Sequence, residues 1–242
     1  MAINTYNESS LHKTLKTYFC QTYFGETEVK ESNFIYDIVT KENDIIEIQT
    51  KNLSKLLPKI ESTIHEQNRK LKLVFPLVIN KHILLLDENG QKISKRKSPI
   101  TNSIYDIFEE LTGIYPLLLE KNFSLTVISI NVTEIRTRTN DNVQSQNNRR
   151  RFRKNWLKID KKLDEILSIS TFNCKNDYLK LIPYTTNDEF CAYDLRNFLK
   201  DKKGLSRNVL KKAYLMIWVL SRMNLIQQTQ IIDKKHYYRI CR

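Results

Sequence analysis

Glycine is scarce in this chain of 242 residues, which holds only Gly25, Gly90, Gly113 and Gly204. So few glycines exclude a Walker-type phosphate loop and a GxGxxG dinucleotide fingerprint, and with them the nucleotide-binding classes that need such loops. Cysteine is equally rare, and the four cysteines show no CxxC spacing. This pattern argues against a zinc module or a disulfide framework and predicts a cytoplasmic protein with reduced thiols.

Long apolar runs are also missing. The longest, residues 214–220, falls far short of the roughly 20 residues that a helix needs to cross a bilayer. The stretch 1–12 is polar and has neither the basic region nor the apolar region of a secretory signal. We therefore expect no membrane partner.

Positive charge is in excess and unevenly placed. The formal net charge is +13. Residues 1–144 hold 18 Lys and Arg against 18 Asp and Glu, whereas residues 145–242 hold 22 against 9. A lysine-rich proteome accounts for many lysines but not for their segregation. The asymmetry predicts that the second half binds a polyanion, most often nucleic acid.

A polar stretch divides the chain. Residues 137–148 have no periodic apolar residue except Val143, which predicts a linker. Basic residues then alternate with aromatic ones, a composition that suits phosphate contacts, although a solvated helix start is the alternative. The expected phosphate contacts are Arg149, Arg150, Arg151, Arg153 and Lys154. We expect one domain over residues 1–140, a basic linker over 141–155 and a second domain over 156–242.

Helical and extended patterns alternate in the first half. Apolar residues at helical spacing predict helices over residues 8–22, 53–64 and 104–111. β-rich runs predict strands over residues 33–40, 44–51, 71–79, 82–87 and 124–136, with residues 91–98 as a loop. This order indicates an α+β domain in which helices flank a mixed sheet.

The second half has a different pattern. Helices are predicted over residues 156–169, 192–202 and 206–223, followed by a hairpin over 225–240. Helix, tight turn, helix and hairpin is the order of a winged helix-turn-helix. Side chains of the types that contact base edges and phosphates lie near the start of the long helix, as expected where a recognition helix enters the major groove. They are Arg207, Asn208, Lys211 and Lys212.

Two carboxylates lie on the first predicted hairpin. Asp37 interrupts the apolar run FIYDIV, and alternation along the next strand places Glu47, Gln49 and Lys51 on one face. Carboxylates on adjacent strands can bind one Mg²⁺, for which two carboxylates and a backbone carbonyl are sufficient ligands. A bound metal lowers the pKa of a water that attacks a phosphodiester. The alternative is a solvent-facing sheet surface without a site.

The hairpin resembles the PD-(D/E)xK nuclease superfamily, in which an Asp on one strand is followed by Glu-x-Lys on the next, with a helix behind. The resemblance implies that Asp37 and Glu47 bind Mg²⁺, or Mn²⁺ as a substitute. Gln49 stands where the superfamily usually has Lys, as in its Glu-x-Gln variants, and Lys51 is the candidate for the missing ammonium. The family often adds a Glu from its opening helix, for which Glu8 is the natural candidate.

These features predict a Mg²⁺-dependent DNA endonuclease of the restriction or repair type, with a restriction-endonuclease-like N-terminal domain and a C-terminal winged helix that holds duplex DNA. The sequence does not separate restriction from repair. The alternative function is a non-catalytic DNA-binding regulator whose nuclease-like half serves for dimerisation or ligand sensing. RNA binding is less favoured because no RNP-type aromatic strand motif is present. A homodimer is compatible with either function.

Overall fold

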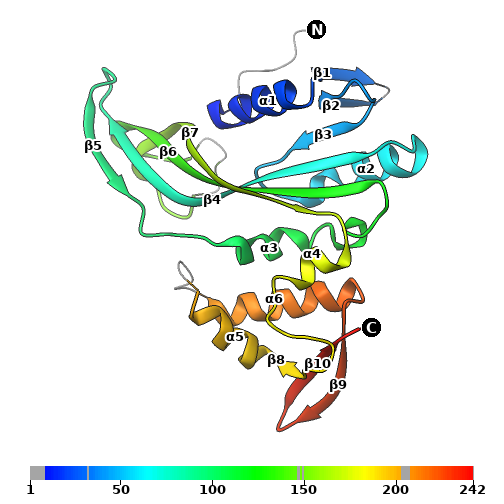
Figure 1. Cartoon of the computed structure of the whole chain (residues 1–242). Helices are drawn as coiled ribbons and strands as arrows, with labels where there is room; N and C mark the ends of the chain where they lie inside the picture. Colours follow the sequence, from blue (N-terminus) through cyan, green and yellow to red (C-terminus); the bar gives the residue numbers. More distant parts are fainter. Residues whose placement is uncertain (1–8, 32, 146–147, 149, 203–207, 242) are drawn as a thin grey trace.

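The structure is a computed structural model that describes residues 9–31, 33–145, 148, 150–202 and 208–241. A long twisted sheet lies under helix α1 (Ser10–Thr22), and short helices cover its other face (Figure 1). A smaller module of helices and a hairpin packs below these short helices. The mixed α+β class predicted from the sequence is confirmed.

The large sheet has seven strands in the order β1-β2-β3-β4-β6-β7, and β5 pairs with the far end of β4. Strand β3 is parallel to β4, and β4 is parallel to β6, whereas the other pairs are antiparallel. The strands are β1 (Glu26–Glu31), β2 (Phe34–Val39), β3 (Ile45–Ile48), β4 (Leu71–Leu86), β5 (Lys92–Lys97), β6 (Phe123–Val143) and β7 (Lys154–Phe172). The predicted hairpin of β2 and β3 is therefore present, although β3 ends three residues before Lys51.

Helices pack on both faces of the sheet. Leu11, Leu15 and Phe19 of α1 pack with apolar side chains of the sheet in one buried cluster. A second, larger cluster includes apolar residues of the short helices, which are η2 (Leu53–Leu56), α2 (Leu57–Glu61), η3 (Ser62–Glu66), η4 (Ile104–Ile107), α3 (Phe108–Leu111) and η5 (Tyr115–Leu117). The two clusters hold the carboxylate-bearing hairpin between α1 and α2.

The C-terminal module has the predicted order of helix, helix and hairpin. Its elements are α4 (Lys175–Leu179), β8 (Phe190–Cys191), α5 (Ala192–Lys200), α6 (Val209–Arg222), β9 (Ile226–Ile232) and β10 (Lys235–Ile240), and its sheet order is β8-β10-β9. Ala213 and Met216 of α6 share one buried cluster with Phe108 and Leu111 of α3. The module therefore packs against the first domain through a continuous apolar core.

Two predictions are wrong: the helix over residues 156–169 and the domain boundary at the linker 141–155. Residues 154–172 form β7, which pairs with β6 along most of its length, so the first domain continues to Phe172. Bulges explain the misleading spacing: Val132 faces Leu163 while Ile130 faces Ile166, so an extra residue lies between them. Leu163 and Ile166 thus lie three residues apart, as on a helix face, yet both pack against the cluster under α1.

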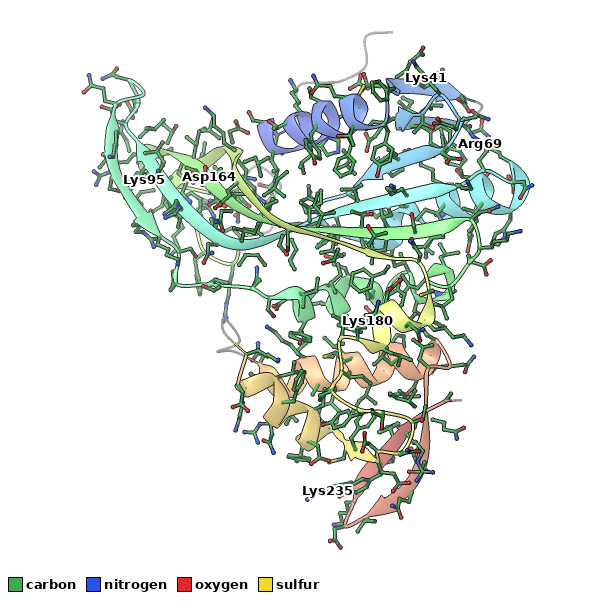
Figure 2. The ribbon with its side chains drawn as sticks, viewed as in Figure 1. Lys41, Arg69, Lys95, Asp164, Lys180 and Lys235 are labelled. Carbon is green, nitrogen blue, oxygen red and sulfur yellow. The ribbon has the colours of Figure 1, made fainter. Side chains whose placement is uncertain are left out.

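Two segments that were predicted to be irregular form strands in the structure. Residues 137–143 of the expected linker continue β6, and residues 92–97 of the expected loop form β5. All six residues of β5 are exposed, and four are Lys or Arg, as is common on an edge strand that must not pair with another chain. The far ends of β4, β6 and β7 together with β5 project beyond the core as an arm, which carries Lys95 and Asp164 (Figure 2). No helix within the described part of the chain is long and apolar enough to span a membrane.

Candidate functional site

Asp37 and Glu47 lie together where β2 and β3 separate. The ladder between the strands pairs Ile38 with Ile46, and beyond it the two carboxylates take over the backbone hydrogen bonds. The Asp37 N–H donates to Glu47 Oε1 at 3.1 Å, and the Ile48 N–H donates to Asp37 Oδ2 at 2.9 Å. Each carboxylate thus accepts a main-chain donor that the sheet leaves unpaired, which fixes the two side chains beside each other.

Three basic side chains from two helices complete the site. His12 Nε2 of α1 lies 2.8 Å from the Ile48 carbonyl oxygen and 3.6 Å from Asp37 Oδ2. Lys16 Nζ, one turn further along α1, lies 3.5 Å from Asp37 Oδ1. From the other side, Lys59 Nζ of α2 lies 2.5 Å from Glu47 Oε1. We call Asp37, Glu47, His12, Lys16 and Lys59 the carboxylate site.

The pKa values of Asp37 and Glu47 are shifted in opposite directions. Burial, followed by the negative charge of Asp37, raises the pKa of Glu47 to about 7 against the opposing effect of Lys59. Burial also raises the pKa of Asp37, but hydrogen bonds from His12 and the Ile48 N–H, with the charges of His12 and Lys16, outweigh it. The pKa of Asp37 therefore lies below its ordinary value. Two neighbouring acids whose pKa values differ in this way are typical of sites that bind cations or transfer protons.

The oxygen atoms of the site are of the kind that binds a hard divalent cation. Asp37 Oδ2 and the Ile48 carbonyl oxygen already converge on His12 Nε2, and Glu47 supplies a second carboxylate. Magnesium accepts one or two carboxylates and keeps several waters. In the described residues no group of three or more His, Cys, Asp and Glu side chains is placed to bind a metal. A cation would therefore depend on these two carboxylates, the carbonyl and water.

The other predicted catalytic residues lie differently. Gln49 follows the end of β3, and its amide donates to the Lys51 carbonyl oxygen at 2.7 Å. Lys51 is exposed and lines a separate cavity, because the strand alternation that was expected to carry it onto the face of Glu47 stops at Ile48. The ammonium at Glu47 belongs to Lys59 instead. Glu8 lies outside the described residues.

Three residues of the site were not predicted from the sequence: His12, Lys16 and Lys59. The spacing of His12 and Lys16, four residues apart beside the apolar positions of a predicted helix, is a weak signal that both lie on one face. Nothing in the sequence pairs Lys59 with Glu47. The start of α1 is fixed by Asp160 of β7, whose carboxylate accepts hydrogen bonds from the N–H and the hydroxyl of Ser10.

The described residues of the basic run lie in the turn between β6 and β7, except Lys154, which is the first residue of β7. Arg150 is used inside this turn: its guanidinium donates to the carbonyl oxygens of Val143 and Trp156 and lies 4.1 Å from the centre of the Trp156 ring. Arg151, Arg153 and Lys154 are exposed. Arg149 lies outside the described residues.

The start of α6 faces the first domain. Lys211 Nζ lies 2.9 Å from Glu109 Oε1, and Lys212 Nζ lies 2.6 Å from Asp106 Oδ1. Asn208 is the residue before the helix, in a left-handed conformation. Two of the side chains predicted to contact DNA, Lys211 and Lys212, therefore form ion pairs with carboxylates of α3 and η4. Arg207 lies outside the described residues.

The first domain coincides with a known family. Residues 9–173 match the family described as Domain of unknown function (DUF8091), and the chain belongs to this family. The match ends directly after β7, where the corrected domain boundary lies. An uncharacterized protein of Treponema pallidum (strain Nichols) is 29% identical over 195 residues, which are 81% of this chain and 74% of that protein. No solved structure matches the chain at a significant level.

Proposed function

We propose that the protein is a Mg²⁺-dependent DNA endonuclease of the restriction or repair type, related to the PD-(D/E)xK nucleases. The observation that carries the proposal is the carboxylate site, where Asp37 and Glu47 meet on adjacent strands between α1 and α2. A pair of carboxylates with pKa values pushed apart, beside three basic side chains, is more than a solvated sheet face requires.

The residues of the site have distinct roles in this proposal. Asp37, Glu47 and the Ile48 carbonyl would hold the metal, which when bound supplies a water of lowered pKa and neutralises charge on the phosphodiester. Lys59 holds Glu47 in place and provides the ammonium that Gln49 cannot. His12 and Lys16 keep Asp37 ionised, so that it is ready to bind a cation at neutral pH.

Duplex DNA is the proposed substrate because of the distribution of charge. With the corrected boundary, residues 174–242 hold 14 Lys and Arg against 6 Asp and Glu, whereas residues 1–173 hold 26 against 21. The C-terminal module keeps a strong excess of positive charge. The exposed Arg151 and Arg153 of the β6–β7 turn and the exposed Lys154 at the start of β7 add to it. Such charges bind nucleic-acid phosphates through release of counterions.

Cleavage of native and modified DNA tests the proposal. Wild-type protein with Mg²⁺ or Mn²⁺ is expected to cut DNA, and Asp37→Asn and Glu47→Gln are expected to abolish cutting with nearly unchanged DNA affinity. These amides keep the size of each side chain and remove its charge. The matched control is Glu42→Gln, an exposed acid in the β2–β3 turn, which should cut normally. A wild-type protein that cuts none of these substrates would exclude the nuclease.

The second candidate is a DNA-binding regulator with a nuclease-like domain that does not cut. The observation in its favour is that Lys59 and backbone N–H groups already satisfy the two carboxylates, with no third acidic ligand among the described residues. In that case the carboxylates are structural, and both amide variants should bind DNA as the wild type does but unfold at lower temperature.

A further inference from the structure

A second cluster of basic side chains lies apart from the carboxylate site. It surrounds a cavity of about 400 Å³ beside the edge of β4 that β3 leaves uncovered. Four lysines from three parts of the fold line it: Lys51 from the segment after β3, Lys81 from β4, and Lys158 and Lys161 from β7. We call this space the lysine cavity.

The acidic residues that line the lysine cavity are already engaged. Glu134 accepts a bond from Arg136 Nε at 2.7 Å and lies 3.3 Å from Lys81 Nζ. Asp106 and Glu109 pair with lysines of α6, and Glu110 Oε2 accepts the Leu53 N–H at 3.0 Å. The hydrogen bond to the Leu53 N–H does not neutralise Glu110, so among the described residues one lining carboxylate without a basic partner faces three lining lysines without an acidic one.

Lys51, Lys158 and Lys161 have no carboxylate within ion-pair distance in the described part of the chain. Lys161 lies directly opposite Glu134 in the β6–β7 ladder, but that acid bonds to Arg136 and Lys81 instead. Burial, followed by the charges of Lys158 and Lys51, lowers the pKa of Lys161 to about 8, while Glu134 opposes this change. Three ammonium groups that line one cavity repel one another, and a bound anion would relieve this repulsion.

We propose that the lysine cavity binds a phosphate group, with Lys51, Lys158 and Lys161 as its ligands. Lysine binds phosphate as a point charge, and several lysines around one oxyanion replace the bidentate geometry that arginine provides. Thr50 also lines the cavity and adds a hydroxyl, whereas the Asn102 amide at its wall donates to the Val78 carbonyl oxygen at 2.8 Å. The phosphate belongs either to a nucleic-acid strand or to a free phosphate compound. This binding needs no cleavage and goes beyond the proposed nuclease activity.

Amine labelling of the full-length protein tests the site without divalent metal, so that nuclease activity plays no part. Acetylation of Lys158 and Lys161 at pH 8 is measured by mass spectrometry with pyrophosphate, with a short DNA strand lacking terminal phosphates, or with neither. Protection by pyrophosphate alone identifies a free phosphate compound, and protection by both identifies a strand. Lys162, the exposed neighbour on β7, serves as the internal control and should label equally in all three samples.

A pair of variants measures the contribution of one ligand. Lys161→Gln should lower the affinity for the protecting ligand about 10- to 100-fold, as read from the protection of Lys158. This is the usual effect of losing a hydrogen bond to a charged group. Lys162→Gln should stay within about twofold, because it removes the same charge from solvent. If neither ligand protects Lys158 or Lys161 in the wild type, the lysine cavity is not a phosphate site, and this result does not depend on whether the variants fold.

Discussion

The raised pKa of Glu47 predicts an unusual dependence of stability on pH. The unfolded chain loses this proton near its ordinary pKa of 4.5, whereas the folded protein keeps it until about pH 7. Between these values the native state binds more protons than the unfolded state, so stability falls as pH rises. A difference of two to three pKa units corresponds to about 3 kcal/mol, or about 1.4 kcal/mol for each pH unit.

Replacing Glu47 by Gln should remove this slope, because the amide does not titrate. The free energy of unfolding in urea, measured from pH 4 to pH 8.5, should therefore fall in the wild type relative to Glu47→Gln by about 3 kcal/mol. Groups that titrate in both proteins, including Asp37, cancel in this difference. Glu42→Gln is the control for the loss of one exposed carboxylate from the same hairpin. Parallel curves for the wild type and Glu47→Gln would show that Lys59 keeps Glu47 ionised and that burial does not dominate.

Three further predictions concern other residues. In a plasmid assay at saturating protein, Lys59→Met should abolish cleavage, whereas Lys51→Met should leave the cleavage rate of bound DNA within a few-fold of wild type; the reverse result would assign the catalytic ammonium to Lys51 instead of Lys59. Arg153→Ala should weaken binding to all duplexes alike and flatten the log–log salt dependence by about one unit or less, which titrations at several salt concentrations would detect. Gly25→Ala should destabilise the protein in thermal unfolding by roughly 1–3 kcal/mol, because the new Cβ would lie 2.6 Å from Ile38 Cγ2; an unchanged melting temperature would contradict this contact.

Local patterns in the sequence predicted much of the fold around the site. The hairpin of β2 and β3, the opening helix and the helix–helix–hairpin order of the C-terminal module all follow from strict periodicity or from turn residues. The long strand β7 could not be predicted in this way. Its ladder with β6 contains several bulges, each of which moves the apolar positions by one residue and destroys the period of two.

Of the residues in the carboxylate site, only the two acids could be predicted from the sequence. Asp37 and Glu47 stand out because charge interrupts apolar strands, and that signal is local. Lys59 reaches Glu47 from a helix that packs beside the hairpin, so its role depends on tertiary packing. Lys51 illustrates the converse, since it has the right spacing from Glu47 but β3 ends before reaching it.

The length of the arm sets a scale for any nucleic acid that the protein holds. Thr126 of β6 is level with Ile48 of the carboxylate site, because Ile48 pairs with Val74 of β4 and Val74 pairs with Thr126, and Val143 lies seventeen residues further along the strand, next to the basic turn. At about 3.3 Å per residue, the two points are separated by at most about 56 Å. A duplex rises about 3.4 Å per base pair, so a duplex bound as proposed that touched both points would be covered over about 16 base pairs. Its footprint would be about one and a half helical turns long, with the basic turn at one end and the carboxylates at the other.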